Sequence, residues 1–159
     1  MGNMSERIAK VKFKEGEWVI HTKQPLDEGD KEATIKLRAQ PHPDMPMAFQ
    51  ALEAVVREVW ELPDSYAKDK ITIIGVSFSQ HEESEVEGAC VTALVSLDTS
   101  NSPGVLNTPH LPYEQYNEGG TQPTLSHDAI HLLETFRSEA AAYVTGKKRL
   151  QPDLFARAA

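Results

Sequence analysis

The chain has 159 residues, of which 40% are apolar, and it carries a formal net charge of −8 at pH 7. A chain of this length can bury about 70% of its unfolded surface, which predicts one compact domain, and it lacks the roughly eighteen consecutive apolar residues that a membrane-spanning helix needs. The acidic balance excludes a protein that coats nucleic acid through its overall field, so any nucleic-acid site has to be local.

Polar and apolar side chains alternate in two stretches near the amino terminus. Residues 10–21 alternate lysines with apolar side chains, which predicts one strand with a bulge at Gly16. Residues 33–40 alternate in the same way, after a turn-rich segment at residues 24–30. We expect the two strands to pair as an antiparallel hairpin.

This pairing predicts a basic strip on the outer face of the hairpin, opposite the apolar rows. Such a strip can bind the phosphate groups of nucleic acid. The alternative is an ordinary solvated strand face, on which lysines also discourage edge-to-edge aggregation. The face has no aromatic side chains on which bases could stack, which counts against a single-strand-binding protein. The five basic residues of the strip are Lys10, Lys12, Lys14, Lys36 and Arg38.

The middle of the chain predicts one helix followed by two strands. Asp44 can cap a helix whose apolar residues recur at helical spacing as far as Trp60, and Pro63 ends it. Residues 71–79 and 86–97 are rich in β-formers. The second of these strands is small or apolar on both faces, which is typical of a central strand covered by helix on at least one side.

Residues 98–126 are rich in Pro, Gly, Asn and Thr, and they predict a long irregular loop. A structureless segment of this length in a compact domain is usually functional or disordered. One hypothesis is a small-ligand site in this loop; the alternative is an ordered covering loop pinned by Leu106, Leu111 and its prolines. The candidate ligand-binding residues are Asn107, Thr108, His110, Tyr113 and Tyr116.

A second helix begins after Ser126, which can cap it, and ends at Gly146. Together these elements predict an α+β fold in residues 10–149: a mostly antiparallel sheet of about four strands, with two helices on one face and the long irregular loop. We expect flexible residues at 1–9 and a flexible carboxyl-terminal tail at 150–159.

The spacing of His127 and His131 matches that of two zinc ligands on one helix face, so a metal site has to be weighed. Helical phase places both rings on the wet side of the helix, away from its apolar stripe, and Asp128 stands where zinc peptidases use Glu as the base. The sequence contains no glycine-rich phosphate loop, dinucleotide fingerprint or paired-cysteine metal site. We therefore assign no catalytic residue, metal or cofactor, and enzyme activity is unsupported.

The tail carries a peptide motif formed by Gln151, Pro152, Asp153, Leu154 and Phe155. These residues resemble the bacterial sliding-clamp-binding peptide, by which replication and repair proteins hold the processivity clamp. The resemblance implies that the Gln151 amide hydrogen-bonds at the rim of the clamp cleft, that Leu154 and Phe155 fill its apolar floor, and that Asp153 takes the position before the leucine. Pro152 departs from the usual leucine. The alternative is that the pair packs back on the body as a last hydrophobic turn.

Residues 71–155 also resemble, more faintly, an uncharacterised family of small phage-encoded proteins found among replication and recombination genes. The amino-acid sequence of residues 102–112 accounts for most of this resemblance. It implies a phage-type accessory protein of DNA replication or recombination that recruits, or inhibits, the clamp in the cytoplasm of a bacterial host. The other hypothesis is a small ligand-binding protein or enzyme that uses the loop at residues 98–126.

Overall fold

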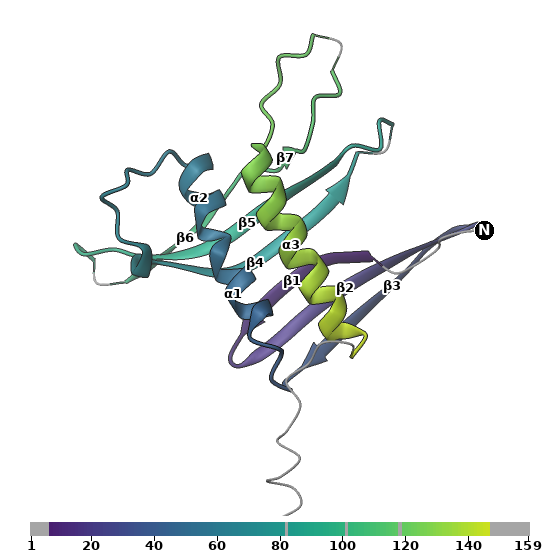
Figure 1. The fold of residues 1–159 in the computed structure, drawn as a ribbon, viewed down its shortest axis with the longest axis horizontal. Coiled ribbons are helices and arrows are strands. Elements are labelled where there is room, and N and C mark those ends of the chain that lie inside the picture. Colours follow the sequence, from purple (N-terminus) through teal and green to yellow (C-terminus); the bar gives the residue numbers. More distant parts are fainter. Residues whose placement is uncertain (1–6, 82, 101, 118, 147–159) are drawn as a thin grey trace, which may run out of the picture.

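A computed structural model of the protein describes residues 7–81, 83–100, 102–117 and 119–146. It contains one antiparallel sheet with the strand order β3-β2-β1-β4-β5-β6, and a short β7 that also pairs with β5. Figure 1 shows the helices α1, α2 and α3 together on one face of this sheet. The fold therefore has two layers, and no described helix covers the other face of the sheet.

The first three strands form a meander: β1 (Arg7–Lys14), β2 (Glu17–Leu26) and β3 (Gly29–Leu37). Glu15 and Gly16 both have positive φ, at 52° and 77°, and they form the tight turn between β1 and β2. Positive φ at both central residues matches the twist of a two-residue hairpin. The prediction of one strand bulged at Gly16 is therefore wrong, because the glycine reverses the chain; the irregularity in β1 lies between Ile8 and Lys10 instead.

The helical layer and the second half of the sheet follow. The predicted first helix is observed as α1 (Asp44–Ala51) and α2 (Glu53–Val59), which meet at Leu52. A 3₁₀ turn, η1 (Lys68–Lys70), leads into β4 (Ile71–Gln80), which pairs with β5 (Glu87–Ser96). β6 (Pro103–Asn107) and β7 (Leu111–Pro112) come next, and α3 (His127–Val144) ends the described fold.

The α+β class holds, but the prediction of a sheet with about four strands is wrong, since the sheet has seven strands. One extra strand comes from the turn at Gly16. The other two, β6 and β7, lie inside the segment predicted to be irregular. Proline removes a backbone donor and is tolerated only at strand edges and starts, so Pro103 and Pro112 hid these short strands from a pattern-based prediction.

The core lies between the sheet and the helices. Inward-facing strand residues such as Val11 and Ile20 are fully buried, as are Leu133 and Phe136 of α3. The ring centroids of Phe49 and Phe136 lie 5.0 Å apart and link α1 to α3. Every buried side-chain nitrogen or oxygen of the described residues has a hydrogen-bond partner.

Both ends of α3 are tied to the rest of the domain. The Ser126 hydroxyl accepts a hydrogen bond of 3.1 Å from the Ala129 amide and so caps the helix. Near the other end, the Tyr143 hydroxyl donates to the carbonyl of Ala39, in the segment that follows β3. Within the described ranges, no helix has the length and apolarity that a membrane span requires.

Candidate functional site

Four lysines gather on the face of the sheet that no described helix covers: Lys10, Lys12, Lys14 and Lys36, here called the lysine patch. Lys12 pairs with Val19 of β2, which pairs in turn with Lys36 of β3. Neighbouring strands are about 4.8 Å apart, and alternate residues of one strand about 7 Å, so the four lysines span roughly 14 Å along β1 and roughly 10 Å across the strands, a spacing suited to several phosphates of one backbone. Their strand neighbour Val11 points to the opposite face and is 0% exposed.

Within the patch, Lys12 experiences the repulsion of its neighbours on β1. The charge of Lys10 lowers the pKa of the Lys12 ammonium from its ordinary value, and Lys14 adds to the effect. Among the ion pairs formed by described residues, none includes Lys10, Lys12, Lys14 or Lys36. None of these four lysines therefore has an ion-pair partner among the described carboxylates, and an external anion would relieve the repulsion at Lys12.

Arg38, the fifth residue of the predicted strip, differs from the lysines. Its Nε donates to Oε2 of Glu17 at 3.1 Å, and its side chain is 84% exposed. Glu17 is also the cross-strand neighbour of Lys14. The guanidinium charge is thus partly neutralised at the end of the strip, and the uncompensated part of the site is the lysine patch.

Beyond β1 the uncovered face continues with small and polar residues that the sequence did not connect with the lysines. Lys10 pairs with Ser77 and Lys12 with Gly75 of β4, and Gly75 in turn pairs with Thr92 of β5. A Cβ at Gly75 would lie 3.6 Å from Cγ of Lys12, so the lysine stem crosses the glycine closely. Gly75 is buried beneath the Lys12 stem, whereas Ser77 and Thr92 are partly exposed and add hydroxyl groups beside the patch. Only the pairing of β1 with β4 brings them there.

The five residues predicted to line a ligand site do not converge. Asn107 lies on the uncovered face, where its Oδ1 accepts a 2.6 Å hydrogen bond from the Thr92 hydroxyl. Thr108 is buried, and it exchanges hydrogen bonds of 2.9 Å with the backbone of Val91. Thr108 thus fastens the segment after β6 to β5.

The other three residues of that set have separate partners. His110 Nε2 lies 2.7 Å from Oγ of Ser79, and burial lowers the pKa of the His110 imidazole. The Tyr113 hydroxyl donates to Glu134 of α3 at 2.7 Å, and burial, reinforced by this carboxylate, raises the pKa of the tyrosine. The Tyr116 ring stacks on His81 with centroids 4.2 Å apart. Two strands within the segment direct these residues to different parts of the molecule.

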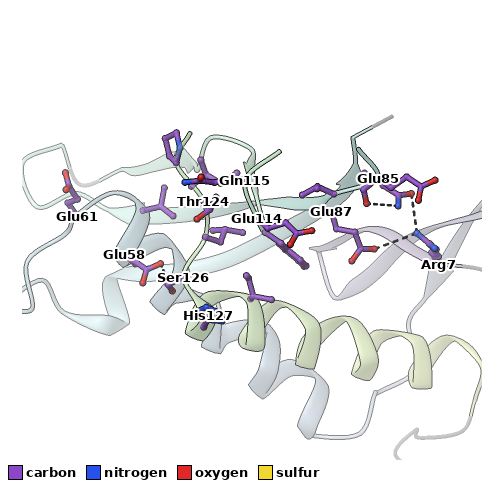
Figure 2. Close-up of a pocket in the computed structure, with 18 residues that line it drawn as sticks. Arg7, Glu58, Glu61, Glu85, Glu87, Glu114, Gln115, Thr124, Ser126 and His127 are labelled. Atoms are coloured by element: carbon purple, nitrogen blue, oxygen red, sulfur yellow. Dashed lines mark hydrogen bonds and ion pairs between the residues drawn. The ribbon is translucent and has the colours of Figure 1, made fainter. Parts of the chain in front are cut away.

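A large groove opens on the helical side, between the start of α3, the end of α2 and the segment that follows β7 (Figure 2). Its volume is about 1240 Å³. Figure 2 shows Glu58 near Ser126 and His127 in one part of the groove, and Arg7 with Glu87 in another. The lining includes five carboxylates, which disfavour phosphate binding: Glu58, Glu61, Glu85, Glu87 and Glu114.

The described residues contain no cluster of three or more His, Cys, Asp or Glu side chains that could hold a metal ion. His127 and His131 are both exposed, on the side of α3 away from its buried stripe. The predicted clamp-binding residues Gln151, Asp153, Leu154 and Phe155 lie outside the described residues. The lysine patch is therefore the functional candidate that the described fold assembles.

Comparisons with protein-family models, with curated proteins and with solved structures gave no match. The functional assignment consequently depends on the chemistry of the residues themselves.

Proposed function

We propose that this protein is a phage-type accessory protein of DNA replication or recombination, which contacts nucleic acid through the lysine patch and binds a bacterial sliding clamp through residues 151–155. One observation carries the proposal for the body: four lysines with no carboxylate partner among the described residues share a sheet face that no described helix covers. A phosphate backbone supplies the missing negative charge.

The proposed contact with nucleic acid is weak and independent of base sequence. Four lysines can neutralise about four phosphates, which for duplex DNA gives a slope of about −3.6 for the logarithm of the binding constant against the logarithm of salt concentration. The net charge of −8 opposes this local attraction at long range. A weak contact of this kind becomes effective when a second contact holds the protein close to DNA.

The clamp peptide supplies that second contact. Burying Leu154 and Phe155 in an apolar cleft stabilises the complex by roughly 1.5–3 kcal/mol each, and ordering the peptide offsets part of this, which corresponds to a dissociation constant in about the micromolar range. A clamp encircling DNA would present the tethered lysine patch to the duplex at a high effective concentration. Each contact therefore strengthens the other.

The nucleic-acid contact is tested with Lys12→Gln combined with Lys36→Gln, measured by fluorescence anisotropy on labelled DNA at several salt concentrations. Each lost phosphate contact costs roughly tenfold in affinity near 0.1 M salt, so we expect about a hundredfold loss and a shallower salt slope. The matched control is Lys31→Gln with Lys70→Gln, which removes the same charge away from the patch. Equal losses in the two double variants would contradict the patch as the contact.

The clamp contact is tested by pull-down with purified bacterial clamp. Leu154→Ala combined with Phe155→Ala should abolish retention of the full chain, because it removes both apolar anchors. The control Arg157→Ala, outside the motif, should retain binding. Retention by the double variant would disprove the peptide assignment and leave the lysine patch to be judged by the DNA measurement alone.

A further inference from the structure

A second hollow, smaller and more apolar than the acidic groove, opens where the turn between β1 and β2 meets the start of α1. Its volume is about 460 Å³, within the range of pockets that hold small ligands. We call it the aromatic pocket, and its apolar lining includes Phe13, Trp18, Pro41, Pro46, Phe49 and Ile73.

The aromatic pocket exposes apolar surface that the described fold leaves uncovered. The Phe13 side chain is 39% exposed, although its ring centroid lies only 4.6 Å from that of the buried Trp18. Trp18 in turn meets Phe49 edge-on at 5.0 Å. The pocket is therefore a hollow with a rigid aromatic wall, suited to an aliphatic or aromatic side chain.

The carboxyl-terminal end of α3 lies at the rim of this pocket. The Tyr143 hydroxyl donates to the carbonyl of Ala39, and Ala39 is itself a lining residue. Gly146, the last described residue, follows Tyr143 by three positions. The chain therefore continues toward residues 147–159 from a point beside the aromatic pocket.

The remaining chain has the length and the chemistry to fill the pocket. Leu154 is eight residues beyond Gly146, so the connecting chain spans at most about 26–29 Å. Leu154 and Phe155 are adjacent apolar residues of the tail. One aliphatic and one aromatic side chain suit the apolar, aromatic lining of the pocket.

We propose that, in the absence of a clamp, Leu154 and Phe155 occupy the aromatic pocket of their own chain, so that the pocket and the clamp cleft compete for the same two side chains. The competitive part rests on the proposed function; the intramolecular contact does not. The occupied pocket makes the body a built-in inhibitor of clamp binding, which a clamp of higher affinity displaces.

The strength that such competition needs is modest. A short linker gives an effective concentration in about the millimolar range, so a contact with an intermolecular dissociation constant of about 1 mM would be formed half of the time. Half occupancy lowers the apparent affinity for the clamp about twofold, and a contact ten times tighter lowers it about tenfold. A micromolar clamp site outcompetes either contact.

The intramolecular contact is tested without any clamp, in the full chain. The sequence has two tryptophans, and Trp60→Phe leaves Trp18 as the only one. Leu154→Ser with Phe155→Ser in this background should uncover the pocket and increase acrylamide quenching of Trp18 about twofold, whereas Arg157→Ala should leave it unchanged. Quenching that is the same with and without the two serines overturns the proposal. A difference that grows with protein concentration overturns it too, since it assigns the pocket to a second copy.

The competition is tested separately by titrating clamp into the full chain. Phe13→Ser should raise the apparent clamp affinity two- to tenfold, toward that of an isolated peptide of residues 147–159. Leu97→Ser, at another exposed apolar residue, should leave the affinity unchanged. An unchanged affinity in Phe13→Ser overturns the competition. If no variant binds clamp, the proposed function fails, while the Trp18 measurement still decides whether the contact forms.

Discussion

The helix-covered face and the uncovered face of the sheet are made by alternate residues of the same strands. On the covered face, Val11, Ile20, Val76 and Val91 form one row across β1, β2, β4 and β5, and all four are buried under the helices. The next residue of β1, Lys12, lies between Val19 of β2 and Gly75 of β4, in a row that no described helix covers. The first row maximises apolar burial, whereas the second concentrates like charges at a cost to stability.

The largest contrast between the two environments should appear in a pair of identical truncations. Phe136→Ala removes a ring that is 0% exposed between α3 and α1, and we expect it to lower the free energy of unfolding by about 3–5 kcal/mol. Phe13→Ala removes a ring at the open edge of the core, and should cost less than about half of that. Urea denaturation of both variants measures the difference. Equal losses would show that Phe13 belongs to the closed core.

A smaller effect is expected for a charge at the boundary of the covered face. Arg137 of α3 lies 3.1 Å from Glu87 and 3.5 Å from Glu134, and its guanidinium lies over the Phe78 ring. Arg137→Met keeps the apolar stem but leaves two carboxylates facing each other, so we expect a loss of about 1–3 kcal/mol in chemical denaturation.

The matched change on the uncovered side is Arg38→Met. Arg38 is paired with Glu17 in an exposed ion pair, and its loss should change the stability by less than about 0.5 kcal/mol. A comparable loss in the two methionine variants would mean that burial of the Arg137 pair does not matter.

A pH effect should distinguish His110 at the edge of the uncovered face. Burial lowers the pKa of its imidazole in the folded protein, so the unfolded chain binds the proton more readily. The stability that neutral His110 contributes should therefore be fully present above about pH 6.5, the ordinary pKa of histidine. It should be lost as the pH falls from about 6.5 toward the lower pKa of the folded state. Thermal unfolding of the wild type and of His110→Gln between about pH 5 and pH 7.5 tests this. The His110→Gln variant should lack this pH-dependent loss of stability. Parallel plots of melting temperature against pH for the two proteins would contradict the role of His110.

The smallest predicted effect is a gain of stability within the lysine patch. Lys12→Thr removes the charge that Lys10 and Lys14 repel and introduces a good strand former. Solvent screens the exposed ammonium groups, so the free energy of unfolding should rise by only about 0.2–0.5 kcal/mol. The gain should shrink with added salt, because salt screens the repulsion. Lys31→Thr, outside the patch, should show no salt-dependent gain. A destabilised Lys12→Thr would remove the argument that the patch opposes stability.

Local patterns predicted much of this fold because they report burial directly. Alternation around Lys12 assigned the lysines and Val11 to opposite faces, and the Ser126 cap located the start of α3. Gly16 was misread because its partner in the turn is Glu15, whereas the common signals for such a turn are Asn-Gly and Asp-Gly. β6 and β7 were missed because they have only five and two residues, which give a weak strand signal. The prolines and glycines around them give a stronger turn signal.

Amino-acid order by itself thus determined which face of its strand or helix most side chains occupy, since a period of two or of 3.6 is a property of neighbouring residues. It did not determine that Phe13 and Trp60 stay partly exposed or that Thr108 is buried. Tertiary structure alone decided that β1 pairs with β4, which extends the lysine patch toward Ser77 and Thr92, and that Tyr143 reaches Ala39 beside the aromatic pocket. The hydrogen bond between Tyr143 and Ala39 joins residues 104 positions apart along the chain. Such contacts are chosen by the packing of the whole core, for which no local pattern carries the information.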